Sequence, residues 1–429
     1  MEQPITADDI SRDLIHFIAK SPSTFHAVRG IKAALLYAGF TEIREEDTWQ
    51  IEKGGKYVVT RNGSALMAFT VPKEGAEAFH ITASHCDSPT FKIKENPEIA
   101  DGPYVKLNVE GYGGMIMSTW LDWLDRPLSV AGRLLVTENG HLAEKLVAID
   151  GTMLVIPSVA IHMDRSVNQH KEWKVQKDML PLYGMTGAKT PFMDVIAAAA
   201  KVKAEDILAH DLILYSRVPA AIWGEEREFI SSPKLDDLQC AFACFRGFTQ
   251  GQKEKYISVY ALFDNEEVGS ATSQGAGSTF LANTLERLAR SLGYSYDETM
   301  AMIARSFMIS ADNAHSVHPN HPEYADPVNR PVINGGIVIK YSAAQKYATN
   351  AFSAAYFKKL CKDHDIPTQT FTNHSDNPGG STLGNISNTV IAMPTVDIGL
   401  PQLAMHSSYE TAGVKDTAYL VDAVTKFYE

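Results

Sequence analysis

The pattern of apolar and polar positions predicts two helices followed by a group of short strands. Apolar residues recur at helical spacing from Ile10 to Ile18, and a second helical pattern covers about 24–38 and ends at Gly39. The strands predicted next are short alternating runs at 56–60, 66–71 and 79–84. The last of these runs leads directly into His85, so a histidine stands where a predicted strand ends.

The pattern changes at about residue 95. β-rich pieces at 104–109, 128–136 and 146–155 are separated by Gly, Pro and Asn turns, and helical periodicity is nearly absent before about residue 194. We therefore expect residues 96–214 to form an inserted, mainly β domain. Its segment Gly111-Tyr112-Gly113-Gly114 is followed by no Gly-Lys-Ser/Thr and lacks dinucleotide spacing, so we interpret it as a turn.

Strands and helices alternate again after about residue 213. The helices are predicted at 238–248, 279–292 and 343–363, and the strands at 256–263, 306–310, 335–340 and 388–398. Such alternation is typical of an α/β sandwich with a largely parallel or mixed sheet. We predict a three-layer α/β/α catalytic domain, formed by residues 1–95 and 215–429, that carries the inserted domain.

Composition narrows the class of protein without naming a function. A chain of 429 residues with 45% apolar and 21% charged residues is typical of a globular protein with two domains or one large domain and an insertion. The net charge of −12 argues against a nucleic-acid or anionic-membrane surface. The four cysteines show no Cys-x-x-Cys spacing, and no apolar run reaches membrane-spanning length. We expect a cytoplasmic protein.

The stretch Asp264-Asn265-Glu266-Glu267 follows the apolar run at 256–263. Carboxylates at the end of a buried strand are costly unless they bind a cation or move protons. Adjacent glutamates would serve both needs, since one can bind a metal while the other handles protons. A solvated acidic turn is the alternative interpretation of this stretch taken alone.

Other candidate ligands also follow apolar runs or turns. They are His85, Asp87, Asp236, Asp312 and His406. Sites in open α/β sheets gather at the carboxyl ends of strands, so these segments could meet in one crevice. Histidine and carboxylate ligands suit zinc, and a carboxylate can bridge two ions where imidazole cannot. Asp87, two residues beyond His85, would point the same way along an extended segment and could orient its ring.

These segments together resemble a known family. The matching motifs are His85-Cys86-Asp87-Ser88-Pro89, Lys234-Leu235-Asp236-Asp237-Leu238, Asp264-Asn265-Glu266-Glu267-Val268-Gly269-Ser270, Ser310-Ala311-Asp312-Asn313-Ala314-His315 and Met405-His406-Ser407. In this order they are similar to the aspartyl aminopeptidases, the M18 metallopeptidases. The similarity also includes residues 21–28 and so spans essentially the whole chain.

The resemblance implies a centre of two zinc ions, with Mn²⁺ or Co²⁺ as alternatives that the same ligand types accept. Asp236 would bridge the ions, His85 and Asp312 would complete one, and Glu267 and His406 the other. Glu266 would be the general base, and Asp87 would orient His85. The implied reaction is removal of the N-terminal residue of a peptide by metal-activated water.

The resemblance also implies a substrate preference and an assembly. Lys340 matches the residue that binds an acidic N-terminal side chain, and His315 and Tyr347 match pocket positions. His162 lies in a segment similar to the one that donates a histidine to a neighbouring subunit's site. The inserted domain would then be a dimerisation domain, and the assembly a tetrahedral dodecamer.

The sequence departs from the family in one loop. Many members carry Pro-Cys-Gly-Ser-Thr-Ile-Gly-Pro where this chain has Pro378-Gly379-Gly380-Ser381-Thr382-Leu383-Gly384-Asn385. A dizinc aminopeptidase or deacylase of broader or different specificity is therefore the alternative function, and a non-catalytic self-assembling scaffold is a third.

Overall fold

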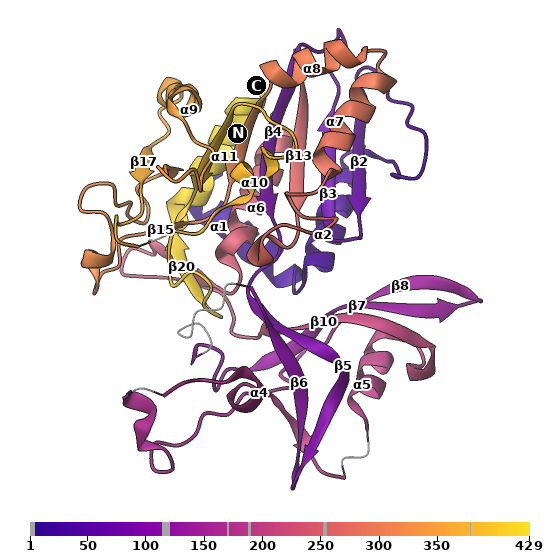
Figure 1. The fold of residues 1–429 in the computed structure, drawn as a ribbon, viewed down its shortest axis with the longest axis vertical. Coiled ribbons are helices and arrows are strands. Elements are labelled where there is room, and N and C mark those ends of the chain that lie inside the picture. The colour runs from indigo at the N-terminus through magenta and orange to yellow at the C-terminus, as the bar shows by residue number, and fades with distance from the viewer. Residues whose placement is uncertain (1–4, 114–120, 170, 188–189, 252–254, 378) are drawn as a thin grey trace.

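The computed structural model describes residues 5–113, 121–169, 171–187, 190–251, 255–377 and 379–429. Figure 1 shows two parts: a large sheet with helices on both faces, and below it a second, twisted sheet. A third, small sheet lies beside the large one. Among the described residues, no helix combines the length and the apolar character needed to cross a membrane.

The large sheet has nine strands and is mixed and mostly parallel. In spatial order the strands are β1 (Thr41–Glu42), β2 (Lys56–Arg61), β3 (Ala65–Thr70), β13 (Tyr256–Phe263), β4 (Ala78–His85), β14 (Phe307–Ala311), β18 (Thr395–Gly399), β16 (Ile337–Lys340) and β17 (Thr368–Phe371). The central strands β13, β4, β14 and β18 run parallel. They are buried on both faces, which explains why the sequences of β13 and β14 are largely apolar.

Helices cover both faces of this sheet and confirm the predicted three-layer arrangement. On one face pack α1 (Ala7–Lys20), α2 (Thr24–Tyr37), α6 (Leu235–Gln250), α9 (Ala351–Asp363) and α11 (Val414–Tyr428). On the other face pack α7 (Phe280–Ser291), α8 (Tyr296–Arg305) and α10 (Leu383–Ser387). Successive side chains of each strand point to opposite faces of the sheet. Tyr260 therefore packs in the core on the α6 face, and Val259 packs in the core on the α7 face.

The second sheet has six strands and is antiparallel throughout. Its strands in spatial order are β8 (His141–Ala148), β7 (Leu128–Glu138), β10 (Ile207–Ser216), β5 (Thr90–Asp101), β6 (Tyr104–Tyr112) and β9 (Leu182–Met185). Helix α5 (Phe192–Ala200) covers it, and its core is separate from those of the large sheet. Short helical turns in this region are η1 (Arg165–Asn168), α4 (Val175–Asp178) and η2 (Ala204–Asp206).

The third sheet was not predicted. It contains β11 (Ala221–Trp223), β12 (Phe229–Ser232), β20 (Glu410–Gly413), β19 (Pro401–Leu403) and β15 (Ala314–His315). The short turns η3 (Glu266–Val268) and η4 (Pro322–Tyr324) complete the elements. Strands of two to four residues are too short to show a period in the sequence, so only tertiary pairing defines them.

Some predicted boundaries were wrong. The helix predicted at 343–363 begins only at Ala351, because the Asn350 side chain accepts the backbone N–H groups of Phe352 and Ser353 and caps it there. The strand predicted at 388–398 begins at Thr395. Helix α8 was missed although Ser295 and Glu298 form a capping box at its start.

Two helical glycines test the packing of the large domain. Gly247 on α6 faces α11, and a Cβ there would lie 2.5 Å from Cγ1 of Val424 and 2.9 Å from the Thr425 nitrogen. A Cβ at Gly30 on α2 would meet no atom within 4 Å. We predict that Gly247→Ala lowers the free energy of unfolding by about 1–3 kcal/mol through overpacking. Gly30→Ala should raise it by about 0.5–1 kcal/mol, because alanine favours the helix.

Denaturant unfolding of the two variants beside the parent chain measures both effects. Equal changes of the same sign would contradict the close contact between α6 and α11.

Candidate metal centre

Most candidate ligands lie at the carboxyl ends of the parallel strands of the large sheet. His85 is the last residue of β4, Asp312 follows β14, and Glu266 and Glu267 form the turn η3 shortly after β13. Asp236 lies in the first turn of α6. Because β4, β13 and β14 run parallel, their carboxyl ends coincide, and residues far apart in sequence become neighbours.

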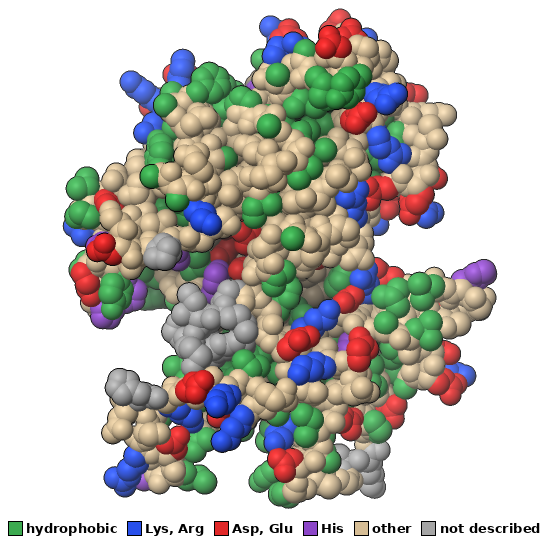
Figure 2. Space-filling view, in the orientation of Figure 1, with side chains coloured by type: hydrophobic (Ala, Val, Ile, Leu, Met, Phe, Trp, Pro, Cys, Tyr) green, Lys and Arg blue, Asp and Glu red, His purple; other side chains and the backbone are tan. Residues whose placement is uncertain are grey.

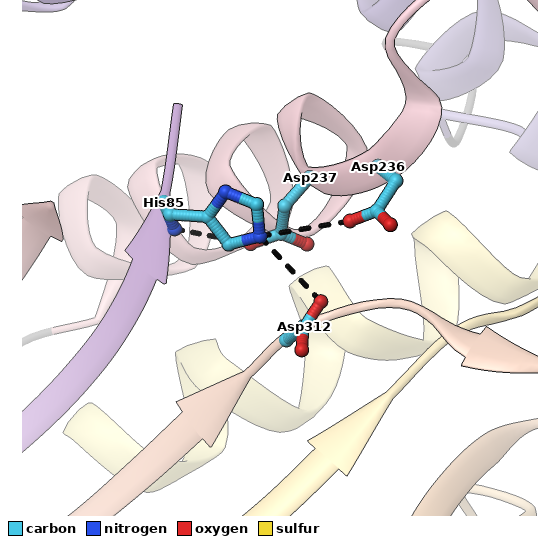
Figure 3. Close-up of side chains that lie close together, drawn as sticks. All are labelled: His85, Asp236, Asp237 and Asp312. Carbon is cyan, nitrogen blue, oxygen red and sulfur yellow. Dashed lines mark hydrogen bonds and ion pairs between the residues drawn. The ribbon is translucent and has the colours of Figure 1, made fainter. Parts of the chain in front are cut away.

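His85, Asp236, Asp237 and Asp312 form the first cluster (Figure 3). The Nε2 atom of His85 lies 3.6 Å from Oδ1 of Asp236 and 3.6 Å from Oδ1 of Asp312. Figure 3 shows the two carboxylates, from α6 and from the end of β14, converging on the same ring nitrogen. Side chains that aim several ligand atoms at one point are the arrangement that a bound cation requires.

His406, Asp236 and Glu267 form a second cluster. The Nε2 atom of His406 lies 3.5 Å from Oδ2 of Asp236 and 3.3 Å from Oε2 of Glu267. The two oxygens of Asp236 therefore face different histidines. Asp236 is the residue that the two clusters share.

The electrostatics of this region favour a cation. Burial is the main cause that raises the pKa of Glu266 to about 8 and the pKa of Glu267 well above its ordinary value, and nearby carboxylates act in the same direction. Burial lowers the pKa of His85, but the surrounding carboxylates outweigh burial and raise it well above its ordinary value. Oδ1 of Asp236 and Oε1 of Glu267 are buried without a hydrogen-bond partner among the described residues. These features fit a metal held by histidine and carboxylate, as zinc is.

Asp87 accepts four hydrogen bonds. Its Oδ1 atom lies 3.2 Å from Nδ1 of His85 and accepts the backbone N–H of Glu266 at 3.1 Å. Its Oδ2 atom accepts the Tyr112 hydroxyl at 2.7 Å and the backbone N–H of Glu267 at 3.1 Å. The carboxylate thus contacts the ring of one candidate ligand and the main chain of the two glutamates at once, a wider role than orienting His85.

Three residues that support the candidate ligands were not predicted from the sequence. Asp237 accepts the backbone N–H of His85 at 3.1 Å. Glu410 accepts the N–H groups of Asp236 at 3.0 Å and His406 at 2.8 Å, and so ties the two segments together. The Thr382 hydroxyl donates to Oδ2 of Asp312 at 2.7 Å. Of these three residues, only Asp237 could have been singled out in the sequence, because it is the neighbour of the predicted ligand Asp236.

The candidate substrate residues lie beside the first cluster. Lys340, buried at the end of β16, donates to Oδ2 of Asp312 at 3.3 Å, and its Nζ lies 5.6 Å from the centre of the Tyr347 ring. Tyr347 packs with Phe371, and the His315 ring lies 6.2 Å from the Phe371 ring. Gly399 permits this crowding, since a Cβ there would lie 2.0 Å from the Asp312 carbonyl oxygen.

His162 is not brought to this place. It lies exposed in the loop after Ile156, and within the described part of the chain no hydrogen bond or ion pair joins it to the clusters. The segment 111–114, predicted to be a turn, is different in the structure: Gly111 and Tyr112 are the last two residues of β6. Gly114 lies outside the described residues. Pro378, the first residue of the loop that departs from the family pattern, also lies outside the described residues.

Figure 2 shows acidic and histidine side chains gathered in a hollow between the two parts of the molecule.

Comparisons with known proteins agree with this geometry. The family model described as aminopeptidase I zinc metalloprotease (M18) matches residues 17–428. A Clostridium novyi protein named "Probable M18 family aminopeptidase 2" is 46% identical over 97% of this chain and 98% of its own. A Ricinus communis protein named "Probable aspartyl aminopeptidase" is 32% identical over 98% of this chain and 95% of its own.

Solved structures share the fold. A chain of the cryo-EM structure of the Ape4 and Nbr1 complex is 34% identical, with a TM-score of 0.95 over 99% of this chain and 86% of that chain. The S. cerevisiae mApe1 dodecamer is 27% identical, with a TM-score of 0.87 over 98% of this chain and 96% of that one. Family, relatives and fold agree across almost the whole length, so this chain belongs to the M18 family of zinc metallo-aminopeptidases, enzymes that act on peptides.

Proposed function

We propose that this protein removes N-terminal Asp or Glu residues from peptides at a centre of two zinc ions. The observation that carries the proposal is the pair of clusters that share Asp236. A carboxylate with one oxygen toward each cluster is the ligand that a two-metal site needs between its ions.

In this proposal His85 and Asp312 complete one zinc site, and Glu267 and His406 complete the other. Bound zinc would lower the pKa of a water molecule and polarise the scissile carbonyl. The same ligand types would also accept Mn²⁺ or Co²⁺. The partnerless buried oxygens of Asp236 and Glu267 support this assignment, because a buried carboxylate oxygen without a donor is costly unless a cation binds it.

Glu266 is the general base of the proposed reaction. Its carboxylate offers an oxygen within 4.8 Å of ligand atoms of His85 and Glu267. The backbone N–H of Glu266 donates to Asp87, and this hydrogen bond fixes the main chain from which the Glu266 side chain extends. From there Glu266 would take a proton from the attacking water and pass it to the leaving amine.

Lys340 supports the preference for acidic residues. It is a buried ammonium whose ion pair among the described residues is with Asp312, a proposed zinc ligand. Once Asp312 neutralises a metal, the ammonium can pair with a substrate carboxylate, with Tyr347 and His315 as the walls of the pocket. The aspartyl aminopeptidase name of the Ricinus relative agrees with this preference.

Assembly would complete the site. The loop around His162 exposes Val159, Ile161 and Met163 at 47%, 45% and 82% of their surfaces. An apolar group of this kind indicates a protein interface. We infer that the six-stranded sheet region, residues 96–214 in the proposed division, dimerises and places His162 in the partner's site, within a dodecamer such as the one mApe1 forms.

The base assignment is tested by Glu266→Gln. We expect two zinc ions per chain, as in the parent, and a turnover reduced by about 10²–10⁴-fold on an Asp-terminated peptide, because the amide cannot take the proton. Metal analysis and kcat on the same sample measure both, with the exposed Glu74→Gln as the control. Near-normal turnover would remove Glu266 from the role, and one zinc per chain would remove the two-ion centre.

The specificity assignment is tested by Lys340→Leu. The value of kcat/KM for Asp- and Glu-terminated peptides should fall by about 30-fold or more, because the substrate carboxylate loses its buried partner. Leu-terminated peptides should change much less. Zinc content must stay at the parent level, since Lys340 also contacts Asp312. The exposed Lys346→Leu is the matched control, and equal losses on all three peptides would refute the pocket.

The shared site is tested by mixing two inactive proteins, His162→Ala and Glu266→Gln. After dissociation and reassembly, half of the dimers are mixed and each holds one site with both residues intact, so roughly one quarter of parent activity should return. The same mixture without subunit exchange is the control. No recovery after proven exchange would exclude His162 from acting in the partner's site.

A further inference from the structure

Tyr112 links the second sheet to the metal centre. It is the last residue of β6 in the six-stranded sheet, yet its hydroxyl donates to Oδ2 of Asp87 at 2.7 Å. Asp87 belongs to the segment after β4 of the large sheet. One hydrogen bond therefore joins the two parts of the molecule directly beside a candidate ligand.

The local fold delivers Tyr112 to this position. Residues Thr90 and Tyr112 face each other at the root of the β5–β6 pair, three residues beyond Asp87. Gly113 then turns the chain with a φ of +96°, and a Cβ there would lie 2.9 Å from the Cα of Pro89. Only glycine permits this approach, so the main chain on both sides of the contact is held close.

The direction of the hydrogen bond follows from its neighbours. The Asn265 side-chain oxygen accepts from Thr272 and from Gln274, each at 2.8 Å. Its amide nitrogen must then face Tyr112, to which it donates at 2.8 Å. The Tyr112 oxygen accepts this bond, so its own proton is free for Asp87.

The bond matters because the residues that the structure describes offer Asp87 no further donor in place of the Tyr112 hydroxyl. Each of its oxygens accepts two bonds, and those bonds go to His85, Tyr112 and the N–H groups of Glu266 and Glu267. Without the Tyr112 hydroxyl, Oδ2 of this buried carboxylate would keep one donor among the described residues, the N–H of Glu267. The carboxylate would then be held by three hydrogen bonds instead of four, and its position against the His85 ring would be less fixed.

We propose that Tyr112 is a positioning residue, whose hydroxyl fixes Asp87 and through it the His85 ring and the main chain of Glu266 and Glu267. The six-stranded sheet thereby helps to set the geometry in which the large sheet holds its metal. This inference rests on the proposed roles of His85, Glu266 and Glu267.

Tyr112→Phe tests the proposal, because it removes the hydroxyl and keeps the ring. The matched control is Tyr215→Phe on β10 of the same sheet, whose hydroxyl donates to the Ile149 carbonyl at 2.7 Å. Zinc affinity is measured on the full-length protein by competition with a chromogenic chelator. Steady-state kinetics with an Asp-terminated peptide at saturating zinc give kcat and KM, and thermal unfolding checks the fold.

We expect Tyr112→Phe to weaken zinc binding about 10-fold, the lower end of the effect of residues that support metal ligands. Its kcat should fall while KM stays within about twofold, because the substrate pocket keeps its residues. Tyr215→Phe should match the parent in zinc affinity and kcat. A Tyr112→Phe protein with the zinc affinity of the Tyr215→Phe control would overturn the proposal.

Failure of the proposed activity and failure of the Tyr112→Phe variant to fold can each be distinguished from failure of this proposal. If the parent binds zinc but cleaves no aminoacyl peptide, the proposed activity fails while the zinc measurements still decide the role of Tyr112. If Tyr112→Phe does not fold, Gly113→Ala carries the same test, since it keeps the hydroxyl but forces the chain away from Pro89. Parent-like zinc affinity in folded Gly113→Ala would count against the proposal.

Discussion

Concentration of negative charge at one edge of a buried sheet is the constraint on which the rest of this structure depends. Asp312, Glu266 and Glu267 approach one another because parallel strands end together, and Asp236 joins them from the first turn of α6. Two histidines alone do not balance these four carboxylates. A zinc metallo-aminopeptidase resolves this with metal. The polypeptide contributes the backbone donors, the buried Lys340 and the Asp87 network, which hold the carboxylates in place before any ion binds.

The supporting contacts show that the site is a property of the whole molecule. Glu410 from the small third sheet accepts N–H groups from two ligand segments, and Thr382, which precedes α10, contacts Asp312. Tyr112 approaches from the six-stranded sheet. Three sheets therefore meet around a few side chains. Preorganisation of this kind lets the ligands keep their geometry at low cost when substrate binds.

Much of this could be predicted from the sequence, for a physical reason. His85 ends a run in which apolar and polar residues alternate, and Asp312 follows a largely apolar run. Both patterns are recognisable as strands whose ends must lie at a sheet edge. Glu410 and Tyr112 could not be found this way, because their importance lies in contacts that include residues distant in sequence, Asp236 for Glu410 and Asp87 for Tyr112, and no sequence pattern marks them. The third sheet was not predicted because its strands are too short to show a sequence pattern; β15 has two residues. The delayed start of α9 depends on the side chain of Asn350, a local feature that helical periodicity does not register.

Strand order has a consequence for how the chain folds. Strands β3 and β4 are consecutive in sequence, but β13 lies between them and pairs with both. All strands of the six-stranded sheet, from Thr90 to Ser216, precede β13 along the chain. During synthesis that sheet can form from contiguous sequence, while the centre of the large sheet waits for β13. Until then the facing edges of β3 and β4 lack their partner, and exposed edges invite aggregation. The newly made chain is therefore open to misassembly at these two edges in this interval.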